Sequence, residues 1–306
     1  MAIVVEGTSF VDIKGFPFDA YIPAGRNAGR VDIIHGGVGR NVAEDIANLE
    51  LRPVYVSMTD DTAVGRDVTA KLKNHKVNTD YIVTTKDGLG LWLAVFDDTG
   101  DVAGSISKRP EMQPLAALIE EKGDEIFAEA DSIVIEIDID KEIVKAVFKF
   151  AKKYNKRVYA LVANMSIAAE RRDFIKETDC FICNNQEADI LFLEDFSSVG
   201  PEDFAELLYE KVVNANIPAM VVTLGENGAV YASKNGERGV CPAKAVTVRD
   251  TTGAGDAFCA GLSVALTYGK NLKEAVEIGN RLASSVITIN ENVCPRFLPQ
   301  EFGITP

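Results

Sequence analysis

The stretch RDTTGAGDAFCAGL, residues 249–262, decides how the C-terminal part of this chain folds. An apolar run with helical spacing follows the glycines and ends at Gly269, which places the glycines at the N-terminus of a helix. Gly253, Ala254 and Gly255 carry little or no side chain, so a ligand can approach their N–H groups directly. These donors and the helix dipole together favour a bound anion.

Asp256 follows within the first turn of this helix. A carboxylate beside a bound phosphate repels it, unless the carboxylate is there to accept a proton from an attacking hydroxyl. A base next to a cradle for negative charge is what phosphoryl transfer to an alcohol requires. Spacing alone leaves an alternative, an ordinary helix start with Gly for the turn and Asp for the dipole.

A second glycine-rich stretch, HGGVGRN, covers residues 35–41 between the strand VDII and the helix NVAEDIANL. It matches neither G-x-G-x-x-G nor G-x-x-x-x-G-K-[ST], and the absence of Lys after the glycines excludes a standard P-loop. Bare backbone and Asn41 could hold sugar hydroxyls. Tight packing explains the glycines equally well.

Strands and helices alternate along most of the chain, which predicts a parallel sheet with helices on both faces. The segment VCPAKAVTV, residues 240–248, is expected to carry an edge strand. The predicted buried strands are IVVEG, VYVSMT, SIVIEI, RVYALV, CFICN and MVVTLG, and the predicted helices are GRNVAEDIANL, TAVGRDVTAKLKNH, KEIVKAVFKFAKKY and PEDFAELLYEKVVNAN.

Two segments, residues 10–34 and 88–106, have a β pattern with no helix between their strands. Asp98-Thr99-Gly100 supplies a hairpin turn in the second segment. We expect the two segments to form a small antiparallel sheet that projects as a lid. Two separate surface hairpins are the alternative.

Bulk properties restrict the function further. The 306 residues carry a net charge of −14, which argues against binding a nucleic-acid polymer. No apolar run approaches the length of about 20 residues that a membrane span needs, and MAIVVEG reads as a first strand, so we expect a cytoplasmic protein without membrane partners. Five cysteines make a disulfide framework unexpected, and Cys180-Phe-Ile-Cys183 is interpreted as a buried strand rather than a redox or metal site.

Four motifs together resemble the PfkB, or ribokinase-like, family of small-molecule kinases. GGVGRNVAEDIANL is similar to the N-terminal signature of the family and DTTGAGDAF to its C-terminal signature, with N-x-x-E at residues 184–187 and T-x-G-x-x-G at residues 223–228. The resemblance implies one α/β domain over residues 1–306, a Rossmann-like three-layer sandwich with a mainly parallel sheet and a β lid.

The resemblance also implies ATP as the phosphate donor, Mg²⁺ as cofactor, Asp256 as the base and the preceding residues 253–255 as the anion hole. The resemblance assigns Asp12, Gly37 and Asn41 to the sugar, and Thr223, Gly225, Gly228 and Asn280 to ATP. It assigns Asn184 and Glu187 to the Mg²⁺ and phosphate side, with Glu187 acting through water. Asp250 and Thr252 are assigned to a monovalent cation, usually K⁺, whose role varies among members.

The acceptor is expected to be a neutral sugar or nucleoside, because a carboxylate at Asp12 would repel a phosphorylated one. Arg40 stands where many relatives have a small residue, and GGVGRN-A-E resembles pseudouridine kinases, which favours the 5′-hydroxyl of pseudouridine and a substrate contact for Arg40. An ion pair with Glu44 is the alternative role of Arg40. Ribose, fructose, inosine and adenosine remain alternative acceptors, and a non-catalytic nucleotide sensor is a third class. Exposed aromatic residues of the lid favour a homodimer formed through it.

Overall fold

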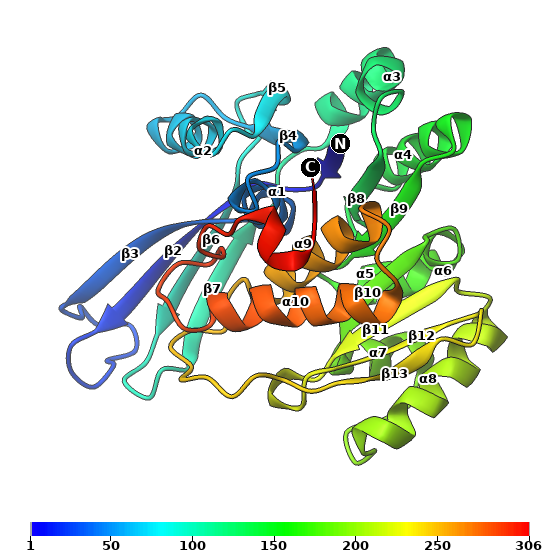
Figure 1. Ribbon diagram of the computed structural model, residues 1–306. Coiled ribbons are helices and arrows are strands. Elements are labelled where there is room, and N and C mark those ends of the chain that lie inside the picture. Colours follow the sequence, from blue (N-terminus) through cyan, green and yellow to red (C-terminus); the bar gives the residue numbers. More distant parts are fainter. Residues whose placement is uncertain (1, 306) are drawn as a thin grey trace.

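A mainly parallel sheet forms the centre of the computed structural model, which describes residues 2–305 (Figure 1). Its strands are β1 (Ile3–Glu6), β4 (Val54–Thr59), β5 (Asn78–Thr84), β8 (Ser132–Glu136), β9 (Arg157–Leu161), β10 (Cys180–Asn184), β11 (Ala219–Thr223), β12 (Ala229–Ser233) and β13 (Arg238–Cys241). They lie in the order β13-β12-β11-β10-β9-β8-β1-β4-β5. The strands from β11 to β5 run parallel, whereas β12 and β13 pair antiparallel at one edge.

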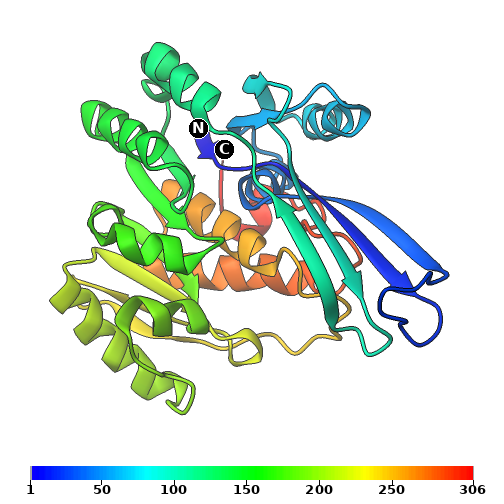
Figure 2. The ribbon, with the colours of Figure 1, turned by 180° about the vertical axis from the view of Figure 1, so that it is seen from behind.

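Helices cover both faces of this sheet, and each face has its own apolar core (Figures 1 and 2). One face carries α1 (Val38–Asn48), α2 (Ala63–Asn74), α9 (Ala254–Thr267) and α10 (Leu272–Val286), and the other carries α3 (Gln113–Phe127), α4 (Lys141–Tyr154), α7 (Asn185–Phe192) and α8 (Pro201–Ala215). Short elements complete the fold: α5 (Met165–Ala168), η1 (Ala169–Arg171), α6 (Arg172–Ile175), η2 (Gly225–Asn227) and η3 (Pro299–Phe302).

The sequence pattern explains these helices locally. In α4, Ile143, Val147 and Phe150 recur at helical spacing and are buried. The side chain of Asp140 caps the helix by accepting the N–H of Glu142 at 2.8 Å. The predicted alternation of buried strands and amphipathic helices is therefore confirmed.

A four-stranded sheet projects from this body as a lid (Figure 2). Its strands are β2 (Phe10–Pro17), β3 (Gly29–Gly36), β6 (Gly90–Phe96) and β7 (Val102–Lys108), in the order β3-β2-β6-β7. The pairs β2–β3 and β6–β7 are antiparallel, and β2 pairs parallel with β6. The two segments predicted to form the lid do combine into one sheet.

The order of strands fixes where ligands can gather. The chain runs outward from β1 to β4 and β5, and then returns to β8 on the other side of β1 before it continues to β9. Ligands of open parallel sheets bind at the carboxyl ends of the strands where this reversal occurs. The ends of β1 and β8 lie at that point, and the lid strand β2 leaves directly after β1.

Three further expectations can be compared with the structure. The edge strand expected in residues 240–248 is wrong in extent, because β13 ends at Cys241 and residues 242–248 are irregular. Pro242 has no N–H to continue the ladder. Cys180 and Cys183 are buried free thiols in β10, as interpreted from the sequence. None of the helices between residues 2 and 305 combines the length and apolar character that crossing a membrane takes.

Candidate active site

The turn before α9 requires glycine. Gly253 precedes the helix with φ of +80°, a left-handed conformation that favours glycine. A Cβ at this position would lie 2.0 Å from the carbonyl oxygen of Asn292. The segment around Asn292 therefore packs directly on the start of α9.

This helix start presents vacant backbone donors. The N–H of Ala254 bonds to the carbonyl oxygen of Thr251 at 3.2 Å, so one of the three donors expected for the anion hole is already used. Within residues 2–305, no acceptor pairs with the N–H groups of Gly253, Gly255 or Asp256. The positive end of the helix dipole lies at these vacant groups, which suits an anion.

Asp256 receives a hydrogen bond from the second glycine-rich stretch. The Nδ2 of Asn41, in α1, donates to Oδ2 of Asp256 at 2.6 Å. The two predicted motifs, far apart in the sequence, thus meet at one carboxylate. This bond occupies one oxygen of Asp256 and leaves the other for a substrate hydroxyl.

The pKa of Asp256 is raised from its ordinary value of 3.8 to about 7. Burial is the largest cause, and the negative charge of Glu187 adds to it. The hydrogen bond from Asn41 and the positive charge of Arg40 act in the opposite direction. A carboxyl poised near neutral pH is suited to accept a proton during a reaction.

Arg40 lies behind Asn41 and forms an ion pair. Its guanidinium bonds to Glu44 and to Oδ1 of Asn41, and donates to Oδ1 of Asn292 at 3.2 Å. Only 1% of the Arg40 side chain is exposed. The expected direct contact between Arg40 and the acceptor is therefore wrong, because the guanidinium is buried and its donors are used; the ion-pair alternative describes the structure.

The lid residue Asp12 faces the second glycine-rich stretch. A Cβ on Gly36 would lie 3.0 Å from Oδ2 of Asp12, so the carboxylate rests close to that backbone. Burial raises the pKa of Asp12, and the charges of Lys14 and Arg40 oppose this. Within the described part of the chain no hydrogen bond is made to this carboxylate, which leaves it available to hydroxyl groups.

Gly37 is required for packing. It has φ of +94°, and a Cβ would lie 2.4 Å from the carbonyl oxygen of Thr8 and 2.7 Å from the N of Phe10. Tight packing therefore accounts for glycine at this position, and a contact of Gly37 with the sugar stays a prediction. Its position also brings Asn41, Asp12 and the end of β1 to one place.

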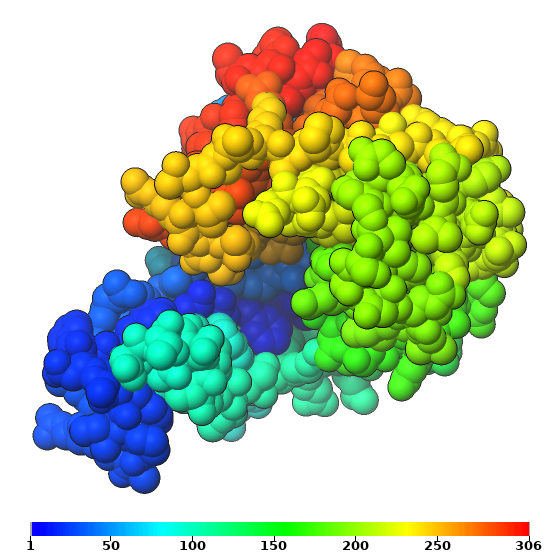
Figure 3. Space-filling model, turned by 90° about the horizontal axis from the view of Figure 1, so that it is seen from below, coloured from blue at the N-terminus to red at the C-terminus, as the bar shows by residue number. Residues whose placement is uncertain are grey.

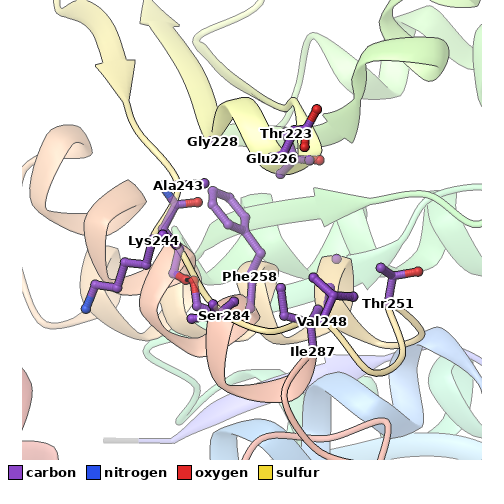
Figure 4. A pocket seen from close by; sticks show the side chains of 17 residues that line it. Thr223, Glu226, Gly228, Ala243, Lys244, Val248, Thr251, Phe258, Ser284 and Ile287 are labelled. Carbon is purple, nitrogen blue, oxygen red and sulfur yellow. Dashed lines mark hydrogen bonds between the residues drawn. The ribbon is translucent and has the colours of Figure 1, made fainter.

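A cavity of about 710 Å³ adjoins the vacant donors of α9 (Figure 4). Figure 4 shows Phe258 pointing into it, with Thr223 and Glu226 on one side and Val248, Thr251 and Ile287 on the other. The residues predicted to bind ATP line it: Thr223, Gly225, Gly228 and Asn280, together with Ala254 and Gly255. This volume lies within the range of small-molecule sites.

Asn184 and Glu187 form a capping box at the start of α7. The side chain of Asn184 accepts the N–H of Glu187 at 2.9 Å, and Glu187 accepts the N–H of Asn184 at 2.7 Å. Burial raises the pKa of Glu187, while the Asn184 N–H lowers it and Asp138 raises it further. One carboxylate oxygen of Glu187 is left without a partner in this capping box. Within residues 2–305 no group of three or more acidic, His or Cys side chains is arranged to hold a metal, and a role of Glu187 toward Mg²⁺ stays a prediction.

Asp250 and Thr252 lie in the turn before α9. The carboxylate of Asp250 accepts the N–H of Thr252 at 2.8 Å. Burial raises the pKa of Asp250, but the hydrogen bonds from Thr252 and the charge of Lys14 act in the opposite direction, and the pKa is lowered. The two residues are brought together as expected, and a role in cation binding stays a prediction.

The sequence analysis missed Glu136, at the end of β8. Its carboxylate accepts the N–H of Thr8 at 2.9 Å and the Thr8 hydroxyl at 2.8 Å. Burial and the charge of Asp138 raise its pKa to about 7, and the charge of Asp256 contributes. An acidic residue that ends a buried parallel strand, as in SIVIEID, was the available signal.

The site lies in a hollow between the lid and the body (Figure 3). In that view the lid strands, blue and cyan, and the segment after β13, in gold, border the hollow. A buried carboxylate beside vacant helix-terminal donors, with an adjoining cavity, suits a phosphotransferase that acts on alcohol groups.

The chain belongs to the pfkB family of carbohydrate kinases, whose profile matches residues 9–291. A guanosine-inosine kinase of Exiguobacterium acetylicum is 32% identical over 292 residues, which cover 95% of each chain. A pseudouridine kinase of Escherichia coli (strain K12) is 23% identical over 290 residues, 94% of this chain and 90% of that one. The structure of Arabidopsis thaliana ribokinase complexed with ribose and ATP matches over 100% of both chains with a TM-score of 0.84 and 21% identity. The predicted family and ribokinase-like fold are confirmed, and the chain is a sugar or nucleoside kinase.

Proposed function

We propose that this protein is an ATP-dependent nucleoside kinase that phosphorylates the 5′-hydroxyl of inosine or guanosine. The bond between Asn41 and Asp256 carries the proposal, because it joins the predicted acceptor site to the helix terminus that lines the cavity of about 710 Å³. The similarity to a guanosine-inosine kinase over 95% of the chain supports the choice of acceptor. Pseudouridine, the acceptor favoured by the sequence, is the second candidate because of the more distant similarity to a pseudouridine kinase.

In this proposal Asp256 accepts the proton of the 5′-hydroxyl while the oxygen attacks the γ-phosphorus of ATP, and the bond from that phosphorus to the β,γ-bridging oxygen breaks so that ADP leaves. The bond from Asn41 fixes one carboxylate oxygen, and the raised pKa makes the carboxylate a competent base near neutral pH. The N–H groups of Gly255 and Asp256 stabilise the negative charge on the transferred group, since no acceptor from residues 2–305 holds them. Each such contribution is worth a factor of about 10²–10⁴ in rate.

Asp12 and Asn41 would hold the sugar. The unpaired carboxylate of Asp12 accepts hydrogen bonds from vicinal hydroxyls and repels a phosphorylated acceptor. Arg40 acts indirectly, because its bond to Oδ1 of Asn41 turns the amide so that Nδ2 points to Asp256. Glu187 would hold Mg²⁺ through water, and the metal when bound supplies neutralisation of phosphate charge.

The deciding experiment is ADP release from MgATP with a panel of acceptors: inosine, guanosine, pseudouridine, uridine, adenosine, ribose and fructose. We expect inosine and guanosine to give the highest kcat/KM, with the 5′-monophosphate as product. Asp256→Asn is the matched control and should lose turnover while it keeps the fold. Higher kcat/KM for pseudouridine would favour the second candidate, and no release above background ATP hydrolysis would favour a non-catalytic sensor.

A homodimer through the lid is part of the proposal. On the lid face opposite Asp12, Ile33, Ile13, Leu93 and Ile106 form one cross-strand row. Ile33 and Ile106 are 60% and 70% exposed, which is unusual for aliphatic side chains that share a row. A second copy offers the matching face under twofold symmetry. Sedimentation equilibrium should give a dimer, and Ile106→Glu a monomer; a monomeric wild-type protein would contradict it.

A further inference from the structure

A second cavity, of about 300 Å³, opens at the carboxyl ends of β1 and β8. It adjoins the acceptor site. Thr8 lines the cavity, and its carbonyl oxygen packs against Gly37. Glu136 also lines the cavity, and the negative charge of Asp256 contributes to its raised pKa. A molecule whose sugar lies at Asp12 and Asn41 can therefore extend into this cavity.

Two of the polar side chains that line the cavity are fixed by other contacts. Oδ1 of Asp138 accepts the N–H of Ala163 at 2.8 Å. The guanidinium of Arg171 donates to the carbonyl oxygen of Ile137 at 3.3 Å and bonds to that of Ile139. Phe10 and Met112 add apolar surface. The cavity thus has a preformed wall with an acceptor group and an apolar face.

Arg109 is the exception. It lines the cavity from the segment between β7 and α3, and within residues 2–305 no hydrogen bond or ion pair holds its guanidinium. Its charge lies close enough to Asp138 to lower the pKa of that carboxyl, which burial raises. Glu136, Asp138 and Asp140 line the same cavity, so a bound anion would face carboxylates. A neutral ligand with both donors and acceptors fits this mixture.

We propose that this cavity holds the base of the nucleoside acceptor and that Arg109 selects 6-oxopurines. The assignment rests on the proposed function. A guanidinium fork matches the adjacent O6 and N7 acceptors of hypoxanthine and guanine. Adenine has an amino donor at position 6, and a pyrimidine has no second acceptor beside O4. Asp138 can accept the ring N1–H, and Phe10 can contact the face of the base.

The test measures kcat and KM for inosine, 7-deazainosine, adenosine and ribose with wild-type protein, Arg109→Ala and Arg109→Gln. Arg109→Ala should lower kcat/KM for inosine about 10–100-fold, mainly through KM, and leave ribose unchanged. Wild-type protein should use 7-deazainosine, which lacks N7, at least several-fold less well than inosine, and Arg109→Ala should use both equally. Arg109→Gln should improve adenosine relative to inosine, because a carboxamide matches N6 and N7 of adenine. Arg66→Ala, which removes an exposed guanidinium paired with Asp61 outside this cavity, is the control.

Two outcomes overturn the assignment, and they are distinguishable. If wild-type protein turns over inosine normally and Arg109→Ala keeps the same ratio of inosine to ribose, Arg109 does not read the base and only this inference fails. If wild-type protein phosphorylates ribose but no nucleoside, the proposed function fails and the base site fails with it.

Discussion

Asn41 and Asp256 are 215 positions apart in the chain, and the amide of one donates a 2.6 Å hydrogen bond to the carboxylate of the other. This bond stabilises the ionised form of Asp256, whereas burial and the charge of Glu187 stabilise the protonated form. The balance places the pKa at about 7, so contacts on either side of the carboxylate set the pH at which it can act as a base.

Removal of the amide should move the pH profile upward. In Asn41→Ala the ionised carboxylate loses a hydrogen bond, so its pKa should rise by about one unit. The acid limb of log kcat/KM against pH, which reports the free enzyme, should shift from about pH 7 by that amount. Initial rates from pH 5.5 to 9 measure it.

Glu187→Gln should shift the same limb in the opposite direction. The substitution removes a negative charge that raises the pKa of Asp256, and Gln can keep the capping box of α7. The limb should move to lower pH. Shifts of the two variants in the same direction, or an unmoved limb in both, would show that another group controls the profile.

Asp256→Asn should stabilise the fold while it abolishes turnover. The folded pKa of about 7 exceeds the ordinary value of 3.8, so the unfolded chain ionises first and the free energy of unfolding falls as pH rises from about 4 to 7. Asparagine removes this loss. We expect Tm at pH 8 to rise by about 2–5 °C, with no gain near pH 4. Turnover should fall at least about 10²-fold.

Scanning calorimetry at pH 4, 6 and 8 checks the stability change. Asp61→Asn, at an exposed surface position, is the control and should show no such pH trend. An equal Tm for Asp256→Asn and wild-type protein at pH 8 would mean that the raised pKa carries no stability cost.

Gly255→Ala should separate stability from activity in a different way. Nothing lies within 4 Å of a Cβ at this position, and alanine favours a helix over glycine by about 1 kcal/mol. The new methyl group would enter the larger cavity beside the vacant donors. We expect unchanged or higher Tm and a loss of at least about 10-fold in kcat/KM for ATP.

Gly200→Ala is the matched control, because its Cβ also meets open space but lies at the start of α8, outside the cavity. Its kinetics should equal those of wild-type protein. If Gly255→Ala has the kinetics of wild-type protein, the start of α9 is not part of the ATP site.

Sequence patterns predicted the strands and helices and identified the motifs that lie at the site, because buried strands and amphipathic helices have local periodicities. They failed where the outcome depends on distant contacts. Residues 242–248 have strand composition, but no strand within residues 2–305 pairs with them after Pro242, and some of them line the larger cavity instead.

Arg40 and Glu136 show the same limit at the site. A charged residue beside a signature suggests a ligand contact, yet Arg40 is buried and donates to Asn292, which is 252 positions away. The place of Glu136 at the end of an apolar run indicates an acid at a strand end, but it does not show which residue that acid contacts. Its partner Thr8 is 128 positions away, and only the order of strands reveals that the two meet.

The ion pair of Arg40 and Glu44 should show strong energetic coupling. Glu44 is fully buried, so Arg40→Met leaves a buried charge that, among the cations of residues 2–305, only Lys71, at 3.2 Å, and His75, at 3.6 Å, still face. Loss of one partner from a buried pair costs about 3 kcal/mol or more, whereas replacing both partners costs less than the sum. Urea unfolding of Arg40→Met, Glu44→Met and the double variant should give a coupling energy of about 1–3 kcal/mol.

The exposed pair of Arg66 and Asp61, 2.7 Å apart, is the control and should couple by less than about 1 kcal/mol. If the two pairs give equal coupling energies, the buried pair of Arg40 and Glu44 is no stronger than an exposed pair. Another contact must then orient Asn41.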